Sequence, residues 1–320
     1  SDTAKTKMVS AQEIVNSNID PSGNLHTRTI TDYASVTFES NDSTKDITSM
    51  NGQSSKQTIN TDVFDNRGNA IHQTVLSEGW DSKTSAFIFS SFQDISNDQI
   101  DIHDQVKHSI VKNYNAAVGG AFMGLDDITY VSRDKFGNAL QQNVTSYNDE
   151  AKTSVREYRE VSNTYKDDVS AKLGNAETTT VTRWKDASKA DSKLVDKTTT
   201  TTTLFDDKGR ALRQTQEISV WNGTAFTNTQ RNEIEFSDYN NRNDAGTQKI
   251  KSIRLDGAVQ TVIDYKVFTN RNFDSSHNIS NQMVLTYSNE TSTTPLDVQE
   301  IRSYGYNAQG VALKQQIITY

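Results

Sequence analysis

The sequence predicts an all-β fold in which tandem β-hairpin repeats of about 35 residues form a long antiparallel sheet that curls into a spiral or a barrel. Three observations support this prediction. A short Asp-to-Gly phrase recurs along the chain, its flanks are rich in Thr, Val, Ile and Tyr, and an aromatic residue follows the glycine at a nearly constant distance. Thr, Val, Ile and Tyr favour strands, and a repeat of roughly 20–50 residues indicates a repeat architecture.

The phrase is clearest in three segments, which read FDNRGNA at 64–70, RDKFGNA at 133–139 and FDDKGRA at 205–211. Weaker copies occur at 20–24, 171–176, 243–246, 274–278 and 307–312, and a degenerate copy occurs at 101–104. Taken in order, the glycine positions are 23, 68, 104, 137, 174, 209, 246, 277 and 310, where Asp104 and His277 replace glycine. The intervals between them run from 31 to 45 residues.

Each phrase predicts a tight turn between two strands. Asp or Asn at the first position accepts a hydrogen bond from the backbone two residues later, and glycine at the fourth position supplies a positive φ. The clearest flanking strands are 127–131 with 139–147, and 198–204 with 211–221. The main predicted turn residues are Asp65, Gly68, Asp134, Gly137, Gly174, Asp206, Gly209 and Gly310.

Residues 1–320 are therefore predicted to form a single continuous array of about nine hairpins without a linker. The chain starts without Met, and its last repeat stops at the aromatic residue Tyr320. We expect the chain to be processed or to belong to a larger chain.

Aromatic residues form a column along the repeat. They follow the glycine position by ten residues in six units and by twelve residues at Trp80 and Trp221. One interpretation is cross-strand packing, which contributes about 0.2–1 kcal/mol per pair. The other is a ladder of exposed rings that contacts sugars or a protein partner, for which the candidates are Trp80, Trp184, Trp221, Tyr147 and Tyr287.

Composition narrows the function classes. Hydrophobic residues make up 33% of the chain, which favours a long sheet with much exposed area, and 27 aromatic residues in register argue against disorder. The net charge of −8 disfavours nucleic acid as a partner. No apolar run approaches the ~18 residues of a membrane helix, and segments such as 198–203 lack the apolar alternation of lipid-facing strands, so we expect a chain that does not span a membrane.

Candidate chemistry is sparse. The chain has no cysteine, which excludes disulfides and thiolate catalysis, and its five histidines form no zinc pattern. The glycine-rich segment 119–124 lacks the lysine of a phosphate loop. We therefore expect no enzyme activity, no catalytic residue and no cofactor, with Ca²⁺ at Asp98, Asp101 and Asp104 as an alternative interpretation of that acidic cluster. An enzyme on a propeller-like scaffold is a further alternative.

The turn phrases FDDKGR at 205–210 and FDNRGN at 64–69 resemble the core of bacterial YD repeats, which occur in Rhs proteins and in the large subunits of insecticidal toxin complexes. The resemblance implies a secreted or surface β-hairpin array that winds into a spiral sheet. In the known families, that sheet can enclose a hollow. This chain departs from the pattern because Phe or Arg replaces the Tyr and because its repeat is longer.

The sequence thus favours a non-enzymatic structural or adhesive β-repeat protein that is extracellular or on a bacterial cell surface. A glycan-binding module that uses the aromatic ladder and a fragment of a toxin-encapsulating YD/Rhs shell are the alternatives. Unpaired edge strands invite pairing, so we expect partners to be other copies or flanking repeats that add at the sheet edges. Glycans or another protein remain alternative partners.

Overall fold

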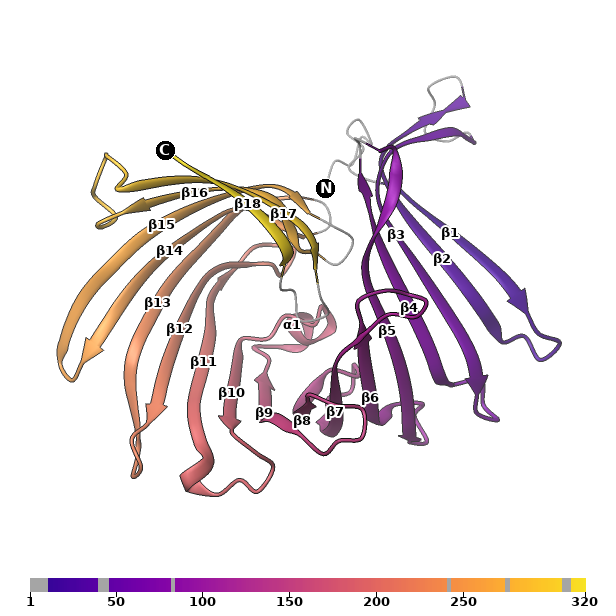
Figure 1. The fold of residues 1–320 in the computed structure, drawn as a ribbon, viewed down its shortest axis with the longest axis horizontal. Helices are drawn as coiled ribbons and strands as arrows, with labels where there is room; N and C mark the ends of the chain where they lie inside the picture. The colour runs from indigo at the N-terminus through magenta and orange to yellow at the C-terminus, as the bar shows by residue number, and fades with distance from the viewer. Residues whose placement is uncertain (1–10, 40–45, 82–83, 241–242, 274–276, 307–311) are drawn as a thin grey trace.

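The computed structural model describes residues 11–39, 46–81, 84–240, 243–273, 277–306 and 312–320. Within these ranges the chain is almost entirely β-strand, which confirms the predicted all-β class (Figure 1). A short helix, α1 (Asp168–Lys172), and a 3₁₀ turn, η2 (Asp191–Lys193), interrupt the strands. In chain order the strands are β1 (Ala11–Ile19), β2 (Leu25–Phe38), β3 (Ile47–Phe64), β4 (Ala70–Asp81), β5 (Ala86–Ile100), β6 (Val106–Tyr114), β7 (Phe122–Arg133), β8 (Ala139–Tyr147), β9 (Val155–Thr164), β10 (Thr178–Trp184), β11 (Leu194–Phe205), β12 (Ala211–Trp221), β13 (Phe226–Tyr239), β14 (Ala245–Asp256), β15 (Val259–Phe273), β16 (Ile279–Tyr287), β17 (Asp297–Tyr306) and β18 (Ala312–Thr319).

These strands form one sheet with the topology of an uninterrupted meander. Each strand pairs antiparallel with the strands before and after it in the chain, from β1 with β2 to β17 with β18. Antiparallel neighbours need only short connections. All the turns that follow odd-numbered strands therefore lie along the same border of the sheet, which we call the turn rim.

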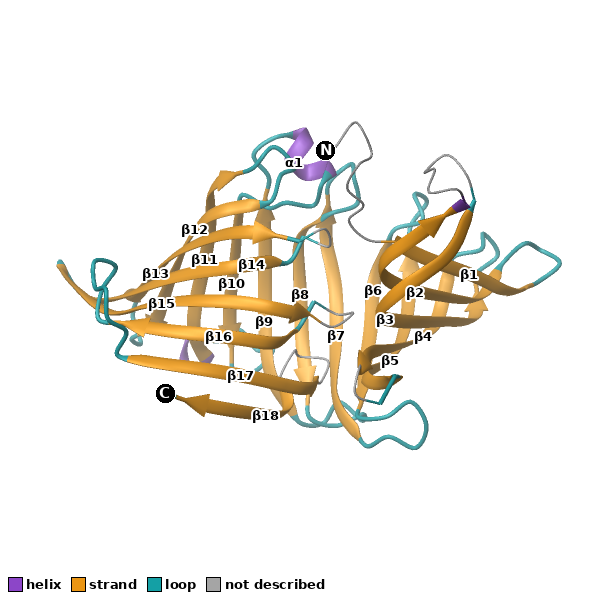
Figure 2. Ribbon diagram, turned by 90° about the horizontal axis from the view of Figure 1, so that it is seen from above, coloured by secondary structure: helices purple, strands orange, loops and turns teal. Residues whose placement is uncertain are grey.

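The sheet is curled but open. β17 comes close to β5, although eleven strands separate them in the meander. Figure 1 shows β1–β5 on one side of the curl and β10–β16 on the other, and Figure 2 shows the same sheet from above. Among the described strands, β1 pairs only with β2 and β18 pairs only with β17. The curl therefore does not close into a barrel.

A β-bulge recurs in the first strand of several hairpins, close to the turn. The register shifts at Thr61/Val63, Tyr130/Ser132, Thr202/Leu204 and Asn270/Asn272. A bulge adds one residue to its strand, bends that strand and increases the local right-handed twist. Its repetition at equivalent places contributes to the curl of the sheet.

The sheet is a single layer. In the described residues, no second sheet or helical layer covers either of its faces. Its accessible surface is 17882 Å², compared with about 13,000 Å² for a compact monomer of this mass. This open architecture accounts for the low content of hydrophobic residues. Within the described ranges, no helix has the length and apolar character that crossing a bilayer requires.

An aliphatic row on one face takes the place of a core. In most hairpins, the residue nine positions before the fourth turn residue and the residue seven positions after it are both apolar. These two residues pair directly with each other across the hairpin. On the inner strands most of these residues are half-buried, and Val144 and Val284 are buried, whereas Ile14 and Ile317 on the border strands are 51% and 54% exposed. The pairs are Ile14–Ile30, Ile59–Val75, Ile95–Val111, Ile128–Val144, Ile234–Ile250, Phe268–Val284 and Ile301–Ile317.

The seventh predicted turn is wrong by three residues. The turn runs from Asn240 to Asp244, and Asn243 adopts the positive φ of 65°. Gly246 instead lies inside β14, where an added Cβ would come within 2.6 Å of the Asp238 carbonyl oxygen. The glycine at 246 thus permits a close backbone approach and does not form the turn. With this correction, Gly209, Asn243 and His277 are spaced 34 residues apart.

The fifth predicted turn is also corrected. Residues 165–177 form a longer loop that contains α1, so Gly174 does not close a tight hairpin. Its φ of 73° and the hydrogen bond from its N–H to the Ala171 carbonyl oxygen place it just after the helix, where glycine commonly ends a helix. The predicted turn residue Gly310 lies outside the described residues.

Candidate functional site

The turn rim has the same local chemistry in unit after unit. At Asp65, one carboxylate oxygen accepts the N–H groups of Arg67 and Asn69, both at 2.8 Å. The N–H of Gly68, whose φ is 84°, donates to the Asp65 carbonyl oxygen. Bonds from the Asn69 side chain and backbone lower the pKa of Asp65. The turns that begin at Asp20, Asp101, Asp134 and Asp206 repeat this arrangement.

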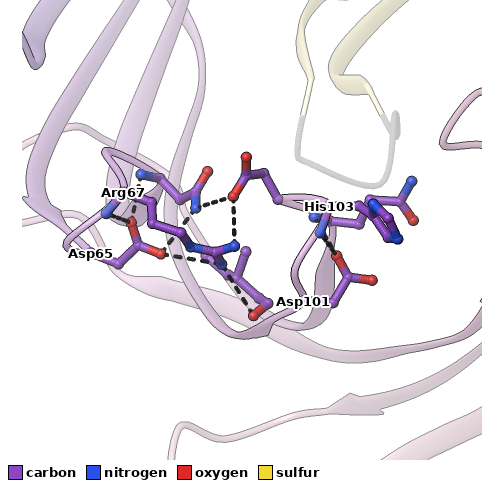
Figure 3. Close-up of polar contacts among 8 residues, drawn as sticks. Asp65, Arg67, Asp101 and His103 are labelled. Atoms are coloured by element: carbon purple, nitrogen blue, oxygen red, sulfur yellow. Dashed lines mark hydrogen bonds and ion pairs between the residues drawn. The ribbon is translucent and has the colours of Figure 1, made fainter.

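Consecutive turns also contact one another along the rim. Asn69 Nδ2 donates to Asp104 Oδ1 at 2.9 Å, and Arg67 forms an ion pair with the same carboxylate at 2.9 Å. Figure 3 shows the turns that contain Asp65 and Asp101 side by side, joined by these contacts. The turn rim is therefore a ridge of touching hairpin ends.

Below the rim, three equivalent asparagines each join three consecutive strands; we call Asn97, Asn163 and Asn270 the bridging asparagines. Each side-chain oxygen accepts a hydrogen bond from the next strand, and each Nδ2 donates to a backbone carbonyl of the preceding strand. The acceptor bonds come from Ser109 (2.8 Å), Thr179 (2.8 Å) and Gln282 (2.7 Å). The donor bonds go to the carbonyl oxygens of Ala70 (3.1 Å), Ala139 (2.9 Å) and Ala245 (2.9 Å).

Other side chains make the donor half of this connection at three further hairpins. Thr202 donates to the Ala176 carbonyl oxygen, Arg133 to that of Val106, and Tyr239 to that of Ala211. Each acceptor stands at or near the start of the second strand of its hairpin. Each of these hairpins is thus bonded to the backbone of the hairpin before it, although the donors differ chemically.

Two histidines connect strands on the opposite face. His72 lies between Asp62 (2.5 Å) and Asp94 (3.1 Å), and joins β3, β4 and β5. Partial burial disfavours the charged imidazolium, but the hydrogen bonds and charges of both carboxylates outweigh this effect and raise the pKa of His72.

His108 repeats this arrangement in the next hairpin. It lies between Asp98 and Asp127, each at 2.7 Å, and Lys152 contacts Asp127 at 2.5 Å. Burial again opposes the charged form, while Asp127 and Asp98 raise the pKa of His108. Because His108 is adjacent to Ser109 in β6, the histidine and the bridging network point to opposite faces.

The candidate ligand-contact aromatics are engaged with other rings. Trp80 and Trp221 are half-buried and pack edge to face on Phe87 and Phe226, with ring centroids 5.0 and 5.2 Å apart. Trp184 is buried against Tyr158 at 5.7 Å. Tyr287 packs on Tyr265 at 6.3 Å, and the half-buried Tyr147 is paired with Leu125, which is 1% exposed.

The acidic residues considered for Ca²⁺ are turned to separate partners. Asp98 bonds His108, Asp101 accepts the N–H groups of His103 and Gln105, and Asp104 contacts Arg67 and Asn69. Among the described residues, no group of three or more His, Cys, Asp or Glu side chains converges as metal ligands would.

A surface groove of about 540 Å³ lies beside α1 and the end of β11. Its acidic side chains include Asp167, which caps α1 by accepting the Ser170 N–H, and Asp206, which holds its own turn. Val169 and Leu173 line the same groove and are 69% and 52% exposed. The carboxylates named here are thus occupied by backbone contacts.

Sequence reasoning missed the bridging asparagines and the aspartate–histidine–aspartate contacts. A signal for the asparagines was present, because Asn97 and Asn270 both precede the turn position by seven residues. His72 and His108 likewise both follow it by four residues. Such columns become visible only when the repeat is aligned on its turns, and the loop that holds α1 shifts Asn163 out of that alignment.

Replacing the buried Asn270 by Ala should destabilise the chain by about 1–3 kcal/mol, because the half-buried Ala245 carbonyl and the Gln282 amide both lose a partner. Asn272→Ala, in the same strand but exposed, is the matched control and should cost less than about 0.5 kcal/mol. Urea unfolding followed by circular dichroism measures both. Equal effects of the two substitutions would contradict the bridging role of Asn270.

The histidines should give the stability a defined pH dependence. A raised pKa in the folded state adds stability that is fully present below the ordinary histidine pKa of 6.5 and is lost as the pH rises through the folded value. The variant His72→Gln/His108→Gln should therefore lose more stability at about pH 5.5 than at about pH 9. Urea unfolding of both proteins at the two pH values tests this, and a larger loss at high pH would show the sign to be wrong.

No family model and no curated protein matches this chain. Its function has to be inferred from the residues and contacts described above.

Proposed function

We propose that this chain is a non-enzymatic structural or adhesive β-repeat protein that works outside the cell or at a bacterial cell surface. The observation that carries the proposal is the lateral connection of each hairpin to the next. Side-chain donors such as Asn97 and Asn270 bind the backbone of the preceding hairpin in a sheet that has no second layer among the described residues. An architecture of this kind holds a long surface in one shape.

The engagement of the polar residues supports the same proposal. The recurrent aspartates accept N–H groups of their own turns, as at Asp65 and Asp206, and the two central histidines are held between carboxylates. Side chains already bonded on two sides are suited to fixing a backbone.

The extracellular or surface location is supported by composition and by the turn phrases. The chain has no cysteine and is rich in Thr, Asn and Ser. Its FDDKGR and FDNRGN segments resemble the core of bacterial YD repeats. An exposed area far above that of a compact monomer is suited to contact with large surfaces. The open curl is equally compatible with a wall segment of a YD/Rhs-type shell.

A glycan-binding module is the second candidate. Trp80 and Trp221 are half-buried, each lies at the end of an even-numbered strand, and each packs against a phenylalanine of the following strand. The repetition of this Trp–Phe pair gives two similar ring surfaces on one sheet. Aromatic rings can stack on sugars, so this alternative is tested separately below.

A structural role predicts that the chain resists extension hairpin by hairpin. Since Gly209, Asn243 and His277 are 34 residues apart, each hairpin released should lengthen the chain by roughly 110–120 Å. Single-molecule stretching between the two ends should show several such steps, and Asn270→Ala should lower the force of the hairpins it joins. Featureless extension without steps would contradict the proposal.

The glycan alternative predicts a different result. If the role is structural, titration with a panel of oligosaccharides should leave tryptophan fluorescence unchanged. A saturable change that disappears in Trp80→Ala/Trp221→Ala, but remains when the buried Trp184 is replaced by Phe, would favour glycan binding over the structural role.

A further inference from the structure

The two border strands of the open sheet carry halves of the junction that joins hairpins inside it. β1 and β18 each have one paired neighbour among the described strands, and they lie apart in the curl (Figure 2). An unpaired strand edge is a template for a further strand.

Inside the sheet, the junction between one hairpin and the next follows a register rule. Here the turn position is the fourth residue of each turn. The residue seven positions after one turn position faces the residue eleven positions before the next turn position. The residue five positions after it faces the residue nine positions before the next turn position. Ile, Val and Gln recur in these places. Examples of the first pairing are Ile30–Gln57, Val75–Gln93 and Val284–Gln299, and examples of the second are Gln73–Ile95 and Gln282–Ile301.

The border strands continue this rule. β18 carries Gln315 and Ile317, which pair on their inner side with Ser303 and Ile301. β1 carries Gln12 and Ile14 at the places that Gln93 and Ile95 occupy in β5. If β18 of one molecule lay beside β1 of another in the internal register, Ile317 would face Gln12 and Gln315 would face Ile14.

Asn16 supplies a second, independent half of the junction. It stands seven residues before its turn position, as Asn97 and Asn270 do, and its Oδ1 accepts a hydrogen bond from Arg28 at 3.1 Å. In Asn97 and Asn270 the Nδ2 donates to an alanine carbonyl of the preceding hairpin. The Nδ2 of Asn16 has no acceptor among the described residues. A preceding hairpin in the internal register would supply the equivalent acceptor.

The corresponding acceptor is present on the other border. Ala312 pairs with Tyr306 at the hairpin end, as Ala70 pairs with Phe64 and Ala245 with Tyr239. The Ala312 carbonyl oxygen is therefore the equivalent of the two carbonyls that accept bridging asparagines. In the continued register, Asn16 of one molecule would donate to Ala312 of the other.

Charge distinguishes this arrangement from pairing of identical borders. Glu13 is the charged residue of β1, and Lys314 is the charged residue of β18. In the continued register the two lie diagonally across the junction, within reach of each other. Pairing β1 with another β1, or β18 with another β18, would offer no opposite charge, because each strand carries charge of one sign only.

We propose that copies of this chain associate head to tail, with β18 of one molecule adding to β1 of the next and continuing the meander. The partner is a second copy because the residues that complement each border are those of the chain's own opposite border. The inference deepens the proposed structural role, on which it rests. Because the two surfaces differ, the contact is heterologous and forms open chains of molecules unless it closes into a ring.

The first test is the mass of the full chain in solution as a function of concentration, measured by sedimentation velocity. The wild type should form dimers and longer species that dissociate on dilution. A wild type that remains monomeric up to the highest soluble concentration would overturn the inference. If that monomer still extended in hairpin steps, the structural role would stand without the edge contact.

The decisive test uses two variants that each block one border. Ile14→Lys/Asn16→Ala alters only β1, and Gln315→Lys/Ile317→Lys alters only β18, all at exposed positions. Each variant alone should be monomeric. An equimolar mixture should give a dimer and nothing larger, because one intact β18 meets one intact β1. No dimer in the mixture, or dimers of either variant alone, would overturn head-to-tail pairing.

A control variant keeps this test independent of folding and of added charge. Val63→Lys/Val220→Lys places two lysines at positions that are 45% and 44% exposed, on strands with two paired neighbours. It should associate as the wild type does. Circular dichroism and urea unfolding of all variants establish that they fold, and loss of association in this control would show that charge alone, not the borders, governs assembly.

Discussion

The structure depends on lateral hydrogen bonding between neighbouring hairpins. A single-layer sheet cannot bury enough apolar surface to be held together by a core. Most residues of its aliphatic row, from Ile14 to Ile317, are only half-buried or exposed. The remaining stabilisation comes from backbone pairing and from side chains that connect three strands at once, as the bridging asparagines do on one face and His72 and His108 do on the other.

This requirement explains the polar composition. A bridging side chain must carry both a donor and an acceptor at one end, and asparagine has both in its amide. Its burial is tolerated because both groups are bonded, whereas an unpaired amide would cost the full desolvation penalty. The chain thus has the polar composition of a disordered sequence, yet its polar side chains supply hydrogen bonds that stabilise the fold. Small polar side chains such as Ser55 and Ser146 are fully buried as well, and they donate to Asp32 and Asp126.

The turns solve a separate problem, which is to reverse the chain within five residues without straining the next hairpin. Positive φ values occur at Gly68, Gly137 and Gly209 but also at Asp104, Asn243 and His277. The four residue types share the turn position because backbone geometry and the preceding Asp or Asn fix the turn. Asp and Asn visit the left-handed region more readily than most residues do.

Repetition of one junction through the sheet also means that the border strands differ from the inner strands mainly because they lack a second paired neighbour.

Sequence reasoning correctly predicted the all-β class, the hairpin unit and most turn positions, because these depend on local chemistry: strand-forming flanks, an aspartate that caps its own turn and a residue that accepts positive φ. It misplaced the turn at Gly246, where a glycine needed for close approach to Asp238 imitated a turn glycine, and the one at Gly174, where the same residue type ends a short helix. Three features became evident only in three dimensions: the curl of the described strands stays open, β17 comes close to β5, and Asn97 reaches Ala70 across 27 residues of chain. Those contacts depend on register and on accumulated twist, and neither is a property of any one repeat.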